Sequence, residues 1–211
     1  MVVPKVVLIG GAPFVGKSET ARCIAARYGY GCIPADDIGK AVGAVTSAEA
    51  FPEIHSMDHL DWRDYFTTTP VDVLLEHATR SRERLWPAFD KIIRTHSTWG
   101  HPLVLEGYTL WPETVVAAGF TATGAIWLAC DDLLLESRVR SQPDFYRGAA
   151  DEEAMIRNVV RRSSRYTELM AASAAEWGAT VISVEARHTV DDVADLCVAA
   201  LSQGRMIDQS N

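Results

Sequence analysis

The chain has 211 residues, of which 48% are hydrophobic and 23% are charged, and this is the balance of one globular domain over 1–211. No apolar run approaches the roughly 20 residues that span a bilayer, so a transmembrane helix is excluded. The formal net charge of −8 repels polyanions, and nucleic acid is therefore not expected as the main partner.

Five short apolar runs rich in β-branched residues are expected to form strands, because such runs without polar alternation are typical of strands buried on both faces. The runs are KVVLIG (5–10), YGCIPA (30–35), PLVLEG (102–107), GAIWLA (124–129) and ATVISV (179–184). The first ends in glycines that continue into a motif, so we interpret it as a strand and not as a signal peptide. The four cysteines are widely spaced without a C-x-x-C pair, which favours a reducing cytoplasm.

Amphipathic stretches between the strands predict helices, and the longest of them has an expected break or restart at Pro87. Residues 43–70 have the weakest periodicity and are expected to form a partly irregular segment over the site. Strands that alternate with helices predict an α/β fold in which helices cover both faces of a parallel sheet. Binding loops are then expected at the carboxyl ends of the strands. The helical stretches are 18–29, 70–100, 151–178 and 189–204.

A phosphate-binding motif follows the first strand. The stretch GAPFVGKS (11–18) matches G-x-x-x-x-G-K-[ST] between an expected strand and an expected helix. The glycines let backbone N–H groups turn toward phosphate oxygens, Lys17 reaches the β- and γ-phosphates, and Ser18 is placed to bind Mg²⁺. The residues expected to hold the nucleotide are Gly11, Ala12, Pro13, Val15, Gly16, Lys17, Ser18 and Glu19.

Two acids follow the second strand. Asp36 is placed to act as a general base that takes a proton from a substrate hydroxyl. Residues 36–39, DDIG, also match the D-x-x-G motif of GTPase switches. The N-K-x-D motif that recognises guanine is absent from the sequence. A helix cap is the other interpretation of the pair Asp36 and Asp37, and the residues leave both readings open.

Further charged residues are expected near the phosphates. Glu106 ends the third strand, where an acid would bind Mg²⁺ or its waters, although a structural role is equally consistent with its place. Residues 138–150 are expected to form a lid, in which Arg138 and Arg147 are candidates to stabilise transferred charge.

The segments 43–70, 72–98 and 107–114 are expected to face an acceptor, and their aromatic residues suggest flat apolar walls. Arg80 and Arg84 lie one turn apart and could bind an acidic group, although pairing with neighbouring glutamates on a helix surface is favoured. The candidate substrate-binding residues are Asp37, Arg80, Arg84 and Tyr108.

Taken in order, these features resemble the small P-loop kinases of the shikimate, gluconate, chloramphenicol and nucleoside monophosphate group, and HPLVLEGYTLWPE (101–113) is similar to a stretch of 2-phosphoglycerate kinase-like proteins. The resemblance covers most of the chain, although only the P-loop is highly specific. It implies a five-stranded sheet in the order 2-3-1-4-5, ATP with Mg²⁺, and an acid after the second strand as the base, here Asp36.

Three functional hypotheses follow. The main one is an ATP-dependent phosphotransferase that acts on a hydroxyl of a small molecule. The second is a nucleotide-dependent regulatory ATPase without an acceptor. The third is a polynucleotide 5′-kinase, which the negative charge and the missing basic run disfavour. The acceptor and the oligomeric state are left open by the sequence.

Overall fold

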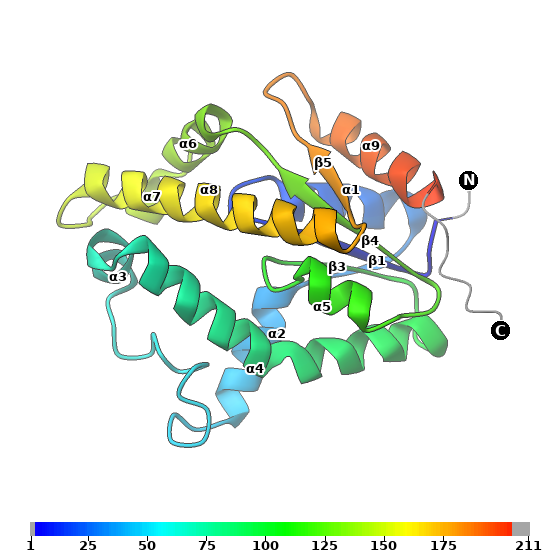
Figure 1. Ribbon diagram of the computed structural model, residues 1–211, viewed down its shortest axis with the longest axis horizontal. Helices are drawn as coiled ribbons and strands as arrows, with labels where there is room; N and C mark the ends of the chain where they lie inside the picture. The colour runs from blue at the N-terminus through cyan, green and yellow to red at the C-terminus, as the bar shows by residue number, and fades with distance from the viewer. Residues whose placement is uncertain (1–2, 204–211) are drawn as a thin grey trace.

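Five parallel strands form the centre of the molecule (Figure 1). The computed structural model describes residues 3–203. The order across the sheet is β2-β3-β1-β4-β5, so the expected α/β fold and strand order are confirmed. All five expected strands are present, and each begins and ends within one residue of the expected position. The strands are β1 (Val6–Gly11), β2 (Gly31–Pro34), β3 (Leu103–Glu106), β4 (Thr123–Ala129) and β5 (Thr180–Ser183).

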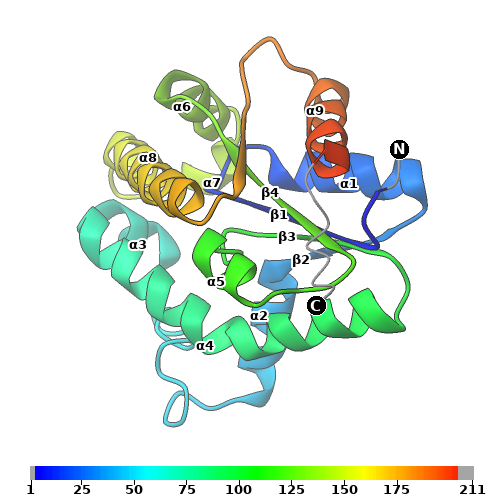
Figure 2. The same cartoon turned by 45° about the vertical axis from the view of Figure 1, so that its right-hand side comes forward.

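Helices cover both faces of this sheet. Helices α1 and α9 pack together on one face, whereas α4, α5 and α8 lie on the other (Figure 2). No helix within residues 3–203 is long and apolar enough to cross a membrane. The helices are α1 (Lys17–Tyr28), α2 (Ala35–Val45), α3 (Trp62–Thr68), α4 (Val71–Thr98), α5 (Pro112–Ala117), α6 (Asp132–Arg140), α7 (Pro143–Tyr146), α8 (Glu152–Glu176) and α9 (Val190–Gln203).

Burial is most complete along the central strands of the sheet. Val6–Ile9 of β1 are fully buried, and the Trp127 side chain of β4 is 1% exposed. The Trp127 Nε1 donates to the carbonyl oxygen of Leu110 at 2.6 Å, so its one polar group is satisfied inside the core. A Cβ added at Gly10 would lie 2.2 Å from Trp127 Cδ1, which explains why glycine stands there.

The break expected at Pro87 is wrong. One helix, α4, runs through this proline. The proline removes one backbone hydrogen bond, and the ribbon changes direction part-way along α4 in both views (Figures 1 and 2). Packing of Leu85 and Phe89 into the core keeps both halves helical on either side of the bend.

The segment 43–70 begins with the last residues of α2 and ends with α3. Between them, residues 46–61 form turns and bends, and Asp61 caps α3 by accepting a hydrogen bond from the Arg63 N–H at 2.8 Å. The segment thereby brings α3 beside α8 and adds side chains to the edge of the molecule where the site lies.

The register of the strands sets the position of the site. Glu106 at the end of β3 is paired with Pro34 at the end of β2 and with Ile9 of β1, so the carboxyl ends of β2 and β3 lie at one level and β1 continues to Gly11. A Cβ on Gly107 would lie 2.4 Å from the Ala35 Cβ, which means that the start of α2 packs closely on the chain leaving β3. The two loops and the P-loop therefore converge at one edge of the sheet.

Candidate active site

The P-loop stretch, residues 11–18, forms the turn between β1 and α1. Phe14 has φ 66° and Gly16 has φ 95°, both in the left-handed region. The Lys17 side chain is 8% exposed, and its Nζ donates to the carbonyl oxygen of Ala12 at 2.7 Å. Burial lowers the pKa of Lys17, while Glu106 and Asp36 act in the opposite direction. Within residues 3–203 this is the one hydrogen bond of the Lys17 side chain, and a buried cation bonded to a neutral carbonyl fits a site for phosphate.

Ser18 and Glu106 meet beside Lys17. The Ser18 Oγ donates to Glu106 Oε1 at 2.8 Å, and Glu106 is 5% exposed. Burial raises the pKa of Glu106, and the bond from Ser18 and the charge of Lys17 oppose that rise. The two oxygen donors fit Mg²⁺. Among the described residues no cluster of three or more His, Cys, Asp or Glu side chains could hold a metal, so a Mg²⁺ here would take its other ligands from phosphates and water.

Asp36 lies in the first turn of α2, and its side chain does not cap the helix. It lines a cavity of about 350 Å³ beside the P-loop, which we call the phosphate cavity, together with Lys17, Ser18 and Glu106. It also lines a neighbouring cavity of about 360 Å³, which we call the aromatic cavity. The neighbouring Asp37 is exposed, lies 3.5 Å from Lys40, and lines neither cavity.

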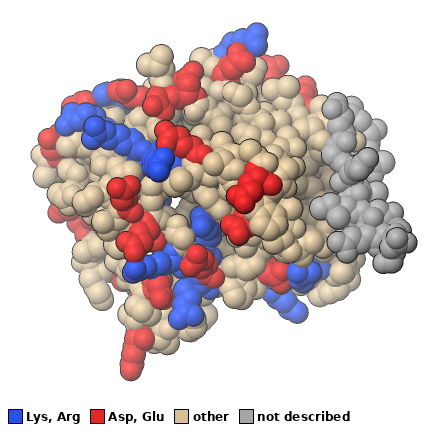
Figure 3. All heavy atoms as spheres, in the orientation of Figure 1, with Lys and Arg blue, Asp and Glu red and all other residues tan. Residues whose placement is uncertain are grey.

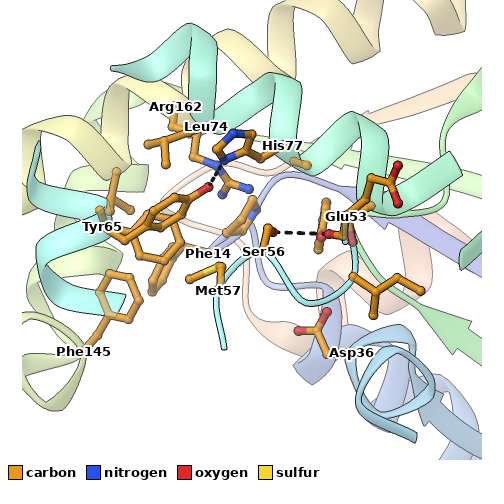
Figure 4. A pocket seen from close by; sticks show the side chains of 17 residues that line it. Phe14, Asp36, Glu53, Ser56, Met57, Tyr65, Leu74, His77, Phe145 and Arg162 are labelled. Carbon is orange, nitrogen blue, oxygen red and sulfur yellow. Dashed lines mark hydrogen bonds between the residues drawn. The ribbon is translucent and has the colours of Figure 1, made fainter. Parts of the chain in front are cut away.

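Aromatic side chains from five parts of the chain form the walls of the aromatic cavity, and several of them are labelled in Figure 4. The Phe14 and Phe145 rings pack edge to face with centroids 5.0 Å apart, which joins the P-loop to α7. The Tyr65 hydroxyl and His77 Nδ1 lie 2.9 Å apart, and these two rings are stacked. The aromatic members of the wall are Phe14, Tyr65, Phe66, His77, Tyr108 and Phe145.

Arg162 enters the aromatic cavity from α8 (Figure 4). The residue is 9% exposed, and its guanidinium carbon lies 5.6 Å from the centroid of the Phe66 ring and 5.9 Å from that of Tyr108. Burial lowers the pKa of Arg162, and the nearby tyrosines oppose this effect.

The two candidate arginines of the expected lid lie in different places. Arg138, in the last turn of α6, donates from Nη1 to the Phe14 carbonyl oxygen at 3.3 Å and lies against Gly16. It also lines a cavity of about 200 Å³ between the P-loop and the chain entering α9, near His188. Arg147 is exposed and lines neither this cavity nor the two described above, and its carbonyl oxygen accepts a hydrogen bond from Arg63 Nε at 3.0 Å.

The other candidate arginines stay outside the aromatic cavity. Arg80 pairs with Glu76 at 2.5 Å, and Arg84 pairs with Glu53 at 3.3 Å. Of the candidate substrate residues, only Tyr108 lines the aromatic cavity.

Sequence reasoning missed three residues of this site. Phe14 occupies a position of the P-loop that the motif leaves free, and it lines the phosphate cavity, the aromatic cavity and the cavity beside Arg138. Phe145 lies in the expected lid but was not singled out. Arg162 is one of seven arginines between residues 130 and 170. Its helical register, four residues after Asn158 and four before Tyr166, is the one signal in the sequence that indicates an inward direction.

No protein-family model matches the chain. Its fold is similar to that of shikimate kinase from Bacteroides thetaiotaomicron, with a TM-score of 0.56, 11% identity, and coverage of 93% of this chain and 98% of that one. It is also similar to a gluconokinase from Sinorhizobium meliloti 1021, with a TM-score of 0.55, 13% identity, and coverage of 96% and 94%. The fold is therefore that of the small P-loop kinases, as the resemblance in the sequence implied.

A curated relative is similar in sequence. The chain is 25% identical over 175 residues to 2-phosphoglycerate kinase from Pyrococcus horikoshii. The match covers 79% of this chain and 58% of that protein, so the chain spans well under two thirds of its relative's length.

Proposed function

We propose that the protein is an ATP-dependent phosphotransferase that transfers a γ-phosphate to a hydroxyl of a small molecule. The observation that carries the proposal is the position of Asp36, whose side chain lines both the phosphate cavity and the aromatic cavity. An acid between a phosphate site and an acceptor site is what hydroxyl phosphorylation requires.

The roles of the P-loop residues follow from their positions. In this proposal Lys17 leaves the Ala12 carbonyl and donates to the β- and γ-phosphates. Ser18 and Glu106 would hold Mg²⁺, which supplies charge neutralisation at the phosphates when bound. The cavity beside Arg138 would take the base of the nucleotide, because it shares Gly16 with the phosphate cavity but is not lined by Asp36.

The transfer step uses Asp36 as a proton acceptor. The acceptor oxygen forms a bond to the γ-phosphorus, the bond from that phosphorus to the bridging oxygen of ADP breaks, and the hydroxyl proton passes to the Asp36 carboxylate. Arg138 would stabilise the charge that develops on the transferred group. Arg147 stays a candidate for the same role, which from its exposed position requires movement of the lid.

The alternatives are a regulatory ATPase and a polynucleotide 5′-kinase. The aromatic cavity supports an acceptor of small size, which a regulatory ATPase does not need. On the face seen in Figure 3, Lys and Arg side chains are interspersed with Asp and Glu, and this face offers no continuous basic track for a polynucleotide.

A cytoplasmic location stays a prediction.

The test is transfer of label from [γ-³²P]ATP to a library of small hydroxyl compounds. Asp36→Asn should lower kcat by about 10²–10⁴-fold while ATP binding persists. Asp37→Asn, at the next residue of α2, is the matched control, and it should lower kcat far less. Lys17→Ala should abolish ATP binding itself. If Asp36→Asn and Asp37→Asn transferred phosphate equally well, the assignment of the base would be wrong.

A further inference from the structure

His55 joins the end of α2 to the turn segment, which we define as residues 47–60 and which is the cyan stretch between α2 and α3 in Figure 1. The His55 Nε2 lies 3.0 Å from the Oγ1 of Thr46, and its Nδ1 lies 2.5 Å from the Oδ2 of Asp58. The Thr46 hydroxyl also donates to the carbonyl oxygen of Val42, in the last turn of α2, at 3.0 Å. The His55 side chain is 11% exposed, so water has little access to replace these contacts.

The protons available in this row of contacts favour one form of the imidazole ring. The Thr46 hydroxyl has a single proton, which it donates to Val42, so toward His55 it acts as an acceptor. An ionised carboxylate such as that of Asp58 also only accepts. Both ring nitrogens therefore face acceptors, and all the contacts are satisfied together when the ring is an imidazolium. A neutral ring loses one of these hydrogen bonds.

The turn segment has few polar contacts with the rest of the molecule. Within residues 3–203, its side chains make two hydrogen bonds outside the segment, from His55 to Thr46 and from Glu53 to Arg84 of α4 at 3.3 Å. The backbone hydrogen bonds of its described residues stay inside it. One apolar side chain, that of Ile54, packs against the core. The contact of His55 is therefore a large share of what holds this segment against α2.

The charged groups around His55 are of kinds that ordinarily keep their charge between pH 5 and 8, whereas imidazole does not. His55 lines a cavity of about 580 Å³, whose walls come from α2, α4, the turn segment and the loop after β3. Burial raises the pKa of Tyr108, which moves that phenol further from neutral pH. The other charged or titratable residues that line this cavity are Asp36, Lys40, Asp58 and Tyr108.

We propose that His55 is a pH-sensitive switch, which holds the turn segment against α2 as an imidazolium and releases it when the ring gives its second proton to water. The contact is complete at low pH and weakens as the pH rises through the range in which histidine loses this proton. The segment also supplies Glu53, Ile54, Ser56 and Met57 to one wall of the aromatic cavity, so its release opens the cavity on that side. The switch does not depend on the reaction that the protein catalyses.

Hydrogen exchange of backbone amides, followed by mass spectrometry, measures how often the turn segment opens. The protection factor divides out the pH dependence of the exchange chemistry itself. In the unmutated protein the protection factor of the segment should fall about 5–10-fold between pH 6 and pH 8, which corresponds to one lost hydrogen bond. Strand β1 should keep its protection. The amides of the segment that donate hydrogen bonds are those of Ala50, Phe51, Ile54, His55, Asp58 and Leu60.

Two pairs of variants separate the switch from a merely structural role. His55→Gln keeps an N–H donor but cannot change its charge, so the protection of the segment should be equal at the two pH values. His59→Gln, at an exposed position of the same segment, is its control and should retain the fall. Thr46→Val removes the acceptor of the ring and should reduce the fall to less than about 2-fold. Thr68→Val is its control, because the Thr68 hydroxyl also donates to a helix carbonyl but contacts no histidine among the described residues.

Equal protection of the turn segment at pH 6 and pH 8 in the unmutated protein would overturn the proposal, as would a fall that persists in His55→Gln. His55→Gln should bind ATP as tightly as the unmutated protein at each pH, because His55 does not line the phosphate cavity. If this variant does not fold or loses ATP binding, Thr46→Val decides, since it leaves the ring in place. The full 5–10-fold fall in Thr46→Val would then overturn the switch.

Discussion

Glu106 is an acid held in an environment that disfavours its charge. Burial raises its pKa, and the hydrogen bond from Ser18 together with the charge of Lys17 keeps the carboxylate form accessible. A Mg²⁺ ligand must be deprotonated. The affinity for Mg²⁺ should therefore fall as the pH is lowered, and because the pKa is raised the fall should begin above the ordinary glutamate range.

Glu106→Gln tests this role. The substitution keeps the size of the side chain and removes its charge, so the gain in ATP affinity on adding Mg²⁺ should shrink by about 10-fold or more. ATP affinity measured by titration calorimetry with Mg²⁺ or with EDTA gives the comparison. Glu113→Gln, at an exposed position of α5, serves as the control and should retain the full gain. An unchanged gain in Glu106→Gln would remove this residue from the proposed metal site.

At the scale of elements, α6 carries two arginines, Arg138 and Arg140, that are two residues apart but lie in different surroundings. Arg138 contacts the P-loop through the Phe14 carbonyl, whereas Arg140 is held between Glu136 of its own helix and Glu153 of α8. The difference follows from helical geometry, since residues two apart point to nearly opposite sides of a helix.

Arg138→Ala should therefore lower kcat by about 100-fold, because it removes a cation that contacts the P-loop next to the proposed phosphate site. Arg140→Ala removes only a partly exposed ion-pair network and should change kcat by less than about 3-fold. Steady-state kinetics of both variants, with circular dichroism to check folding, gives the measurement. Equal kcat values for the two variants would contradict the role of Arg138.

The elements also differ in how far the sequence predicts them. Central strands such as β1 are readable because both faces are buried, which leaves an uninterrupted apolar run. The short helices α3 and α5 carry too few turns to show a period of their own. The continuity of α4 through Pro87 depends on contacts of Phe89 with the core, which lie outside any local pattern.

At the scale of the whole molecule, α9 packs on the core and contributes a buried thiol, Cys197, to it. Cys197 is fully buried, and burial raises its pKa to about 12 from the ordinary 9.0. The folded state therefore binds the thiol proton more tightly than the unfolded state does. The stabilisation is complete below pH 9.0 and is lost as the pH rises toward 12.

The free energy of unfolding should consequently fall by about 2 kcal/mol between pH 9 and 10.5 through this thiol alone. Urea unfolding at pH 8 and pH 10.5 checks the prediction. Cys197→Ala and Cys197→Val differ in side-chain volume and should differ in stability at pH 8. Between pH 8 and pH 10.5, however, the free energy of unfolding of both variants should fall by about 2 kcal/mol less than that of the unmutated protein. If both variants lose as much as the unmutated protein, other groups control the alkaline limit.

Local patterns by themselves determined the parallel sheet, its helices and the P-loop, because apolar runs and the G-x-x-x-x-G-K-S spacing each act over a few neighbouring residues. Only the tertiary structure decided which polar residues meet. It brings Ser18 to Glu106 and places Asp36 between two cavities, while it leaves Arg80 and Arg84 paired outside. It also turns Arg162 inward without a partner, since burial and charge pairing depend on elements that are far apart in the chain.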